Sequence, residues 1–246
     1  MSKQNNIPAI IPLDLQQPRP LTAGLIHLYV TPVSELLRAE SELLTYIKPE
    51  EDARAARFIN PEHGRQHRCI RGMLRKLLGQ YLNVAPNKIA FQYAEHGKPS
   101  LQDNPPLHFN LSHSRDMVAF AFSLEHELGV DIEYMRAQKD LGGMMRHVGS
   151  AREQAEWQCL DEAAAEQAFY RLWTRKEAFI KAVGRGLGMG LRSIHIGTAA
   201  DTAPRPVEYK NELLADWFIQ DLEPPENYKL AVCSKYINRS EYSTYG

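Results

Sequence analysis

The chain has 246 residues, of which 43% are hydrophobic and 24% charged, and its formal net charge at pH 7 is -1. This length accommodates one large domain or two halves of about 120 residues, each with its own core. The composition excludes extensive disorder, and no stretch reaches the roughly 18 consecutive apolar residues of a membrane helix.

The cysteines and the first residues indicate in which cellular compartment the protein is expected. Cys69, Cys159 and Cys233 are far apart and form no CxxC pair, so neither a zinc ribbon nor a disulfide framework is supported. Residues 1–6 are polar and lack the basic and apolar segments of a secretory signal. We therefore expect a cytoplasmic protein with reduced thiols.

The first part of the chain is predicted to be mainly helical. Residues 1–24 contain four prolines and little periodicity, so a proline-rich, extended arm is expected there. A short strand is predicted over residues 25–30, and helices over 34–47 and 51–58. A longer helix over 61–82 begins at a proline and has apolar residues at helical spacing along one face.

The middle of the chain changes to alternating apolar and polar residues, the pattern of half-buried strands. From about residue 150 helical patterns return, the longest over 162–183, and strand-like segments close the chain. Strands are predicted over residues 89–93, 107–111, 117–122, 128–132, 193–196, 217–222 and 229–234. This order predicts an α+β fold of two halves, residues 25–125 and 126–246, although no sequence repeat between them is visible.

Two carboxylates share one face of a predicted strand. Residues 129–133 read Gly-Val-Asp-Ile-Glu. Side chains two apart on a strand point the same way, so Asp131 and Glu133 lie together while Val130 and Ile132 enter a core. Neighbouring carboxylates repel unless a cation lies between them, and a divalent metal ion is the usual partner. A solvated acidic edge strand explains the same pattern and is the commoner case.

The helix predicted over 162–183 carries Trp173, Glu177 and Lys181 at i, i+4 and i+8, which makes one stripe. Apolar residues cover much of the remaining surface, so this helix is expected to be largely buried. A carboxylate and an ammonium beside an indole on a buried helix favour a functional site, and a surface ion pair is the alternative.

Residues 110–114, Asn-Leu-Ser-His-Ser, join a predicted strand to a polar turn. Ser112 and His113 are the residue types of a hydrolase nucleophile and base. However, neighbours on a strand point apart, and the chain has no GxSxG elbow. An anion-binding turn suits these residues equally well, and so does a solvated one.

A stripe of basic side chains lies on the helix predicted over 61–82. Arg68, Arg71 and Arg75 recur at i+3 and i+4 spacing, and Lys98 lies in a Gly-Lys-Pro turn. In a chain of near-neutral total charge, a local basic element fits a bound phosphate better than a wrapped nucleic acid. A solvated cationic face is the default alternative.

Each pattern is weak alone, but their order and spacing match one family. Gly97-Lys-Pro is followed by Phe109-Asn-Leu-Ser-His-Ser, Leu128-Gly-Val-Asp-Ile-Glu, Trp173-Thr-Arg-Lys-Glu-Ala-Phe-Ile-Lys and Gly184-Arg-Gly-Leu. Over roughly residues 25–234 the chain resembles the 4′-phosphopantetheinyl transferases of the Sfp type. The resemblance implies two similar α+β halves that form a pseudo-dimer within one chain, with the active site at their interface.

The resemblance also implies a reaction. Such enzymes transfer 4′-phosphopantetheine from coenzyme A to a serine of an apo acyl carrier protein or peptidyl carrier domain and release 3′,5′-ADP. Asp131, Glu133 and Glu177 would hold Mg²⁺, or Mn²⁺ in its place, and hard carboxylate oxygens are the ligands that Mg²⁺ prefers. Glu177 would accept the serine proton, directly or through a water, and Lys181 would stabilise charge on the transferring phosphate.

The same resemblance implies a set of coenzyme A contacts, at Arg54, Arg68, Lys98, Ser112 and His113. The chain departs from the family pattern at Glu50 and Glu51, where related enzymes often place a basic residue. This departure puts one peripheral phosphate contact in doubt, though not the reaction.

Two other functional classes compete with this interpretation. A nucleic-acid-binding module would use the basic stripe but would leave the three carboxylates unexplained. A metal-dependent phosphohydrolase would explain the carboxylates, but such sites usually add His or further Asp ligands for a second metal. The expected partners are therefore coenzyme A and an apo carrier protein, with neither nucleic acid nor a membrane, and the chain is expected to be a monomer.

Overall fold

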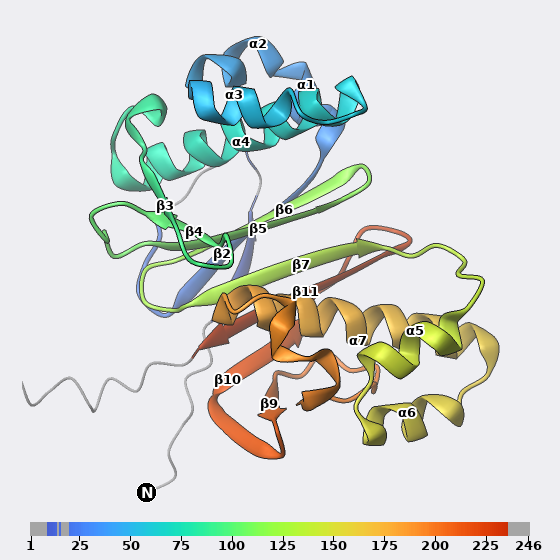
Figure 1. Cartoon of the computed structure of the whole chain (residues 1–246). Coiled ribbons are helices and arrows are strands. Elements are labelled where there is room, and N and C mark those ends of the chain that lie inside the picture. Colours follow the sequence, from blue (N-terminus) through green and yellow to red (C-terminus); the bar gives the residue numbers. More distant parts are fainter. Residues whose placement is uncertain (1–8, 14, 16–19, 236–246) are drawn as a thin grey trace, which may run out of the picture.

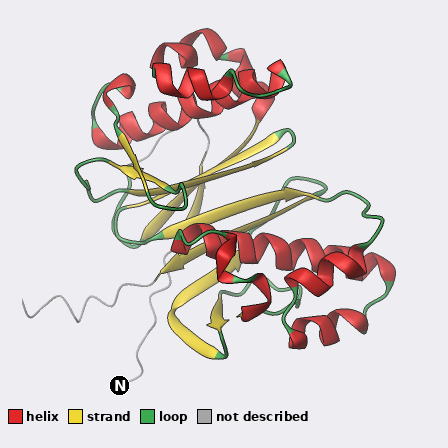
Figure 2. Ribbon diagram, viewed as in Figure 1, coloured by secondary structure: helices red, strands yellow, loops and turns green. Residues whose placement is uncertain are grey.

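The computed structural model describes residues 9–13, 15 and 20–235. Two sheets face each other in the centre of the molecule, and helices cover the outer side of each (Figure 1). The first half of the chain builds one sheet with its helices, and the second half builds the other (Figure 1). Figure 2 shows the strands of both sheets between the two groups of helices. Among the described residues, no helix is long and apolar enough to span a membrane.

The first sheet has the strand order β1–β2–β6–β5, with bounds Ala9–Leu13 (β1), Leu25–Pro32 (β2), His108–Ser114 (β5) and Met117–Ser123 (β6). Its helices are Val33–Arg38 (α1), Glu40–Leu43 (α2), Pro49–Ala55 (α3) and Pro61–Leu82 (α4). A separate small hairpin consists of Phe91–Tyr93 (β3) and Pro99–Leu101 (β4).

The second sheet has the order β7–β11–β10–β9–β8. Its strands are Leu128–Tyr134 (β7), Ile194–His195 (β8), Arg205–Tyr209 (β9), Glu212–Asp221 (β10) and Tyr228–Lys235 (β11). The helices of this half are Leu141–Val148 (α5), Ala151–Gln158 (α6) and Glu162–Val183 (α7).

Both halves repeat one arrangement, which consists of a strand, a long helix and a hairpin. The first half builds it from β2, α4, β5 and β6, and the second from β7, α7, β10 and β11. In each half the last strand pairs antiparallel with the other two. The expectation of two similar α+β halves is therefore confirmed, and the repeat lies in the topology of the elements.

The two long helices begin and end where the sequence predicts. The Asn60 and Asp161 side chains each accept a backbone N–H bond at the start of α4 and α7, respectively, as good N-cap residues do. The helices end at Asn83 and Gly184, which both adopt the left-handed conformation that Gly and Asn favour at helix ends. Local capping thus sets the ends of both elements.

One apolar cluster packs α5 against α7, and three apolar layers hold the sheets and the long helices together. One lies between α4 and the first sheet, one between the two sheets, and one between α7 and the second sheet. Val130 and Ile132 are buried in the layer between the sheets, as predicted, so the strand pleat directs Asp131 and Glu133 to the opposite face. A Cβ added at Gly129 would lie 2.1 Å from the Ala178 carbonyl oxygen, and this glycine therefore allows α7 to approach β7 closely.

The first half contains a buried polar group in the corresponding place, between β2 and α4. Tyr81 on α4 bonds through its hydroxyl to His27 Nδ1 (2.8 Å) and to the Tyr29 hydroxyl (2.7 Å). His27 and Tyr29 alternate on β2 and are almost completely buried. These mutual hydrogen bonds offset the cost of burying polar groups.

The structure differs from the expectations at several places. The single helix predicted over 34–47 is broken at Ala39, and α2 packs where Gly72 of α4 leaves room for the Leu43 backbone. The strands β4 and β9 and the helix α5 were not predicted. Part of the expected arm forms β1, a parallel edge strand beside β2, while residues 1–8, 14 and 16–19 of that arm lie outside the described residues.

Candidate active site

The two halves meet where β5 lies along β7, and side chains connect these two strands. The Asn110 side-chain oxygen accepts the Val130 N–H (3.0 Å). Further along, the Ser112 hydroxyl donates to Asp131 Oδ1 (2.8 Å) and the Ser114 hydroxyl to Glu133 Oε2 (2.9 Å). The predicted carboxylates therefore lie at the junction of the halves.

Asp131 is the most deeply buried of the predicted site residues, with a relative exposure of 2%. Its Oδ1 accepts a hydrogen bond from Lys181 Nζ on α7 (2.5 Å) as well as the bond from Ser112. Burial raises the pKa of Asp131 to about 7, although Lys181 acts in the opposite direction. The residue thus depends on positive charge to remain ionised near neutral pH.

The predicted stripe on α7 faces the same place. Trp173 Nε1 donates to Glu133 Oε1 (3.2 Å), and Lys181 reaches both Asp131 and the Ser112 hydroxyl. Burial raises the pKa of Glu177, with Lys181 again lowering it and Glu133 raising it. The helix therefore brings a carboxylate, an ammonium and an indole to the carboxylates of β7.

The three carboxylates supply donors that suit a hard cation. Asp131 Oδ2 and Glu177 Oε1 are buried and accept no hydrogen bond from the described residues, a costly state for carboxylate oxygens that a cation would relieve. As the described side chains stand, however, no three His, Cys, Asp or Glu residues gather into a complete metal site. The donor set fits Mg²⁺, which uses one or two carboxylates and takes its other ligands from water and substrate phosphate.

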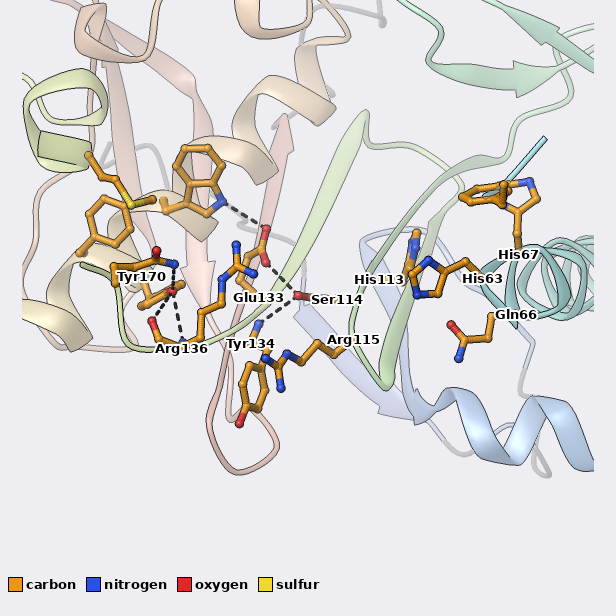
Figure 3. Close-up of a pocket in the computed structure, with 15 residues that line it drawn as sticks. His63, Gln66, His67, His113, Ser114, Arg115, Glu133, Tyr134, Arg136 and Tyr170 are labelled. Atoms are coloured by element: carbon orange, nitrogen blue, oxygen red, sulfur yellow. Dashed lines mark hydrogen bonds between the residues drawn. The ribbon is translucent and has the colours of Figure 1, made fainter. Parts of the chain in front are cut away.

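Ser112 and His113 do not form a hydrolase pair. Ser112 points to β7, where it bonds to Asp131, whereas His113 faces a cavity on the side of α4 (Figure 3). The surrounding protein lowers the pKa of His113 by desolvation, and the charge of Lys181 adds to this effect. An approaching anion would favour the charged imidazole.

Three cavities converge on this junction. The largest, of about 510 Å³, lies between the halves and is named the interface cavity (Figure 3). It is lined by Phe58, His63, His67, His113, Ser114 and Arg115 from the first half and by Glu133, Tyr134, Arg136, Met144, Phe169, Tyr170 and Trp173 from the second.

The other two cavities lie beside it. The basic cavity, of about 420 Å³, is lined by Glu50, Glu51, Arg54, His67, Ile70, Arg71, Tyr93, Gly97, Pro99, Leu111 and His113. The lysine cavity, of about 280 Å³, includes Lys98, Glu177, Lys181 and Gly184. The basic and lysine cavities share the lining residues Gly97, Pro99 and Leu111, and the lysine cavity includes Glu177. An extended ligand that lies across both cavities would therefore reach this carboxylate.

Only some of the predicted coenzyme contacts line the cavities, and the others bond to protein groups. Arg54 and His113 line the basic cavity, and Ser112 is buried at Asp131. Arg68 instead pairs with Asp52 (2.5 Å) and lines none of the three cavities. The Lys98 ammonium donates to two backbone carbonyl oxygens, those of Leu128 and Ala182.

Two residues of the basic cavity were not among the predicted coenzyme contacts, although Arg71 belongs to the basic stripe noted in the sequence. His67 and Arg71 line it, and their i, i+4 spacing on α4 was the available signal. Desolvation lowers the pKa of His67 to about 4, with Arg71 and Arg54 contributing. The cavity therefore holds cationic groups in close proximity.

Glu51 explains the departure noted in the sequence. This residue is only 5% exposed, and its two oxygens accept bonds from Arg71 (2.8 Å) and Arg75 (2.7 Å). Both guanidinium groups also lie over the Phe91 ring. Glu51 is thus a structural partner of the basic helix.

Comparison with known proteins identifies the family of the chain. A family model for the 4′-phosphopantetheinyl transferase superfamily matches residues 127–233, and one for the N-terminal region of 4′-phosphopantetheinyl transferases matches residues 36–125. The 4′-phosphopantetheinyl transferase HetI of Nostoc sp. (strain PCC 7120) is 35% identical over 84% of this chain and 86% of its own length.

Two further relatives carry the same description. The 4′-phosphopantetheinyl transferase Sfp of Bacillus subtilis (strain 168) is 29% identical over 82% of this chain and 88% of its own length. AcpT of Escherichia coli (strain K12) is 39% identical over 50% of this chain and 61% of its own length. The chain belongs to the 4′-phosphopantetheinyl transferase family.

Proposed function

We propose that the junction of the two halves transfers 4′-phosphopantetheine from coenzyme A to a serine of an apo acyl or peptidyl carrier protein, with Mg²⁺ or Mn²⁺ as the metal. Membership of the family makes the chain a transferase, with coenzyme A as its donor substrate. The observation that carries the proposed site is the meeting of Asp131, Glu133, Glu177 and Lys181 where three cavities converge. A nucleic-acid module and a phosphohydrolase lack comparable support.

The carboxylates and the lysine have separate roles in this proposal. When bound by Asp131, Glu133 and Glu177, Mg²⁺ would offset the charge of the pyrophosphate and of the departing 3′,5′-ADP. Lys181 would stabilise negative charge on the transferring phosphate. Glu177 would accept the proton of the carrier serine, directly or through a water, and its raised pKa suits a general base that works near neutral pH.

The nucleotide end of coenzyme A would occupy the basic cavity. Arg54 and His113 line that cavity and would bind the 3′-phosphate, because charge-assisted hydrogen bonds to phosphate are strong. Arg71 replaces Arg68 in this proposal, because Arg71 lines the basic cavity whereas Arg68 lines none of the three cavities. Ser112 would orient Lys181 and Asp131 through its hydroxyl.

The carrier protein would dock at the interface cavity. Arg115 and Arg136 line it together with apolar side chains such as Phe58 and Met144, which suits an acidic helix that also presents apolar residues. We further propose that the chain acts as a monomer in the cytoplasm, with neither nucleic acid nor a membrane as partner.

The test is a transfer assay read by intact mass. The protein is incubated with coenzyme A, Mg²⁺ and a panel of fatty-acid, polyketide and peptide-synthetase apo carriers. A mass gain equal to one phosphopantetheine group is expected on at least one carrier, and none on the same carrier with its serine replaced by alanine. A mass gain that persists in excess EDTA would refute the metal, and no gain on any carrier would refute the proposed function.

A further inference from the structure

The turn that carries Lys98 belongs to the first half of the chain, yet its ammonium contacts the second half. Lys98 Nζ donates to the carbonyl oxygen of Ala182 (2.5 Å) and lies 3.3 Å from that of Leu128. Ala182 lies in the last turn of α7, and Leu128 is the first residue of β7. One side chain therefore joins the two elements that carry the proposed reaction centre.

The carbonyl groups at the end of α7 require hydrogen-bond donors, and the Lys98 ammonium supplies one. The last carbonyl groups of a helix lack partners within the helix, and the end of the helix is the negative end of its dipole. In α7 the C-cap N–H of Gly184 bonds to Ile180 O. Lys98 provides a charged donor for Ala182, one residue after Lys181.

The packing around Lys98 supports a fixed contact. A Cβ added at Gly184 would lie 3.0 Å from Lys98 Cδ, and one at Gly186 would lie 3.5 Å from His96 Cβ. The segment after α7 therefore lies directly on the turn formed by residues 96–98. Burial of the ammonium lowers the pKa of Lys98, which agrees with a nitrogen enclosed by protein.

We propose that Lys98 is a positioning residue: its ammonium holds the end of α7 against the start of β7 and thereby keeps Lys181 and Glu177 at Asp131. In this role the nitrogen binds backbone carbonyl oxygens and not a phosphate of coenzyme A. The lysine side chain lines the lysine cavity, so the coenzyme can pass beside its stem. The kinetic consequence rests on the proposed function, whereas the structural consequence does not.

The experiment compares Lys98→Met with Lys88→Met, an exposed lysine of the same half whose loss removes the same charge. Backbone amide exchange of residues 180–184 is measured in the full chain by mass spectrometry or NMR. Because a hydrogen bond to a charged group contributes about 1.5–3 kcal/mol, Lys98→Met is expected to speed exchange at these amides by about ten- to a hundredfold. Lys88→Met should leave it unchanged, and Lys98→Arg should restore part of the protection.

Kinetics distinguish this role from phosphate binding. Lys98→Met is expected to lower kcat at least tenfold while the KM for coenzyme A changes less than threefold, because the helix residues act in the transition state. A KM raised tenfold or more with unchanged exchange at residues 180–184 would overturn the proposal and return Lys98 to the coenzyme site. Unchanged exchange with unchanged kinetics would overturn it as well. If the wild type transfers nothing, the proposed function fails, and the exchange measurement still decides whether Lys98 holds α7.

Discussion

Glu51 offers a direct test of how the basic cavity is held. Its carboxylate is buried between Arg71 and Arg75, whose side chains are 10% and 1% exposed. Replacing Glu51 by glutamine keeps the shape but leaves two buried guanidinium groups without their charged partner. Breaking a buried pair costs about 3–5 kcal/mol, and for a chain of this size each kcal/mol lowers Tm by roughly 2–4 °C. We therefore expect Glu51→Gln to lower Tm by roughly 6–20 °C.

The pH dependence of the stability lost in Glu51→Gln provides a second measurement. Burial pushes the pKa of Glu51 up, but the bonds and charges of Arg75 and Arg71 outweigh it, so the folded pKa lies below the ordinary value of 4.5. The stabilisation is therefore complete above the ordinary value and is lost as the pH falls through the lower folded value. The difference between wild type and variant should accordingly shrink as the pH falls below about 4.5.

The assay is chemical unfolding in urea at several pH values, with thermal melts alongside. Glu50→Gln is the matched control, because Glu50 is the exposed neighbour on the same helix and its loss should change the free energy of unfolding by less than about 0.5 kcal/mol. A loss below about 1 kcal/mol for Glu51→Gln would refute the reasoning, since exposed ion pairs contribute no more than that.

Three further predictions concern the reaction centre and its substrates. Asp131→Asn and Glu177→Gln should abolish transfer while the protein stays folded. Each should raise Tm in the absence of metal, because burial raises the pKa of both carboxyl groups. Activity near the wild-type level would contradict the metal assignment. His113→Ala should raise the KM for coenzyme A by about ten- to a hundredfold and should do little further harm with dephospho-coenzyme A, so equal damage with both donors would place His113 elsewhere. The KM for the carrier should rise with salt, because exposed charges are screened beyond about 8 Å at physiological ionic strength; a KM independent of salt would indicate a mainly apolar interface.

Helix capping and strand alternation, which depend on residues close together in the sequence, correctly predicted parts of the fold. The ends of α4 and α7 follow from their capping residues, and the opposed faces of Asp131 and Val130 follow from the pleat of a strand. The parallel pairing of β1 with β2 could not be predicted, because a proline-rich segment gives no period that identifies its neighbour.

The same division applies to the candidate site. Arg68 and Arg71 lie three residues apart on one helix, and their sequence context hardly distinguishes them. Which of them lines the basic cavity depends on the packing of α3 on α4. This packing places Asp52 beside Arg68 and Glu51 beside Arg71. The contacts of Lys98 with the end of α7 span 84 residues of sequence, so only the assembled halves reveal them.

The repeated strand–helix–hairpin unit occurs twice, but only one copy carries the residues of the proposed reaction centre. In the second half, β7 presents Asp131 and Glu133 toward α7, whereas in the first half β2 presents His27 and Tyr29 toward Tyr81. That second set consists of one imidazole and two phenol side chains, so none of these three residues offers a carboxylate to a cation. When one copy of a duplicated unit performs the chemistry, the other copy is free to diverge toward substrate recognition. The residues that line the basic cavity, among them His67 and Arg71, belong to the first half.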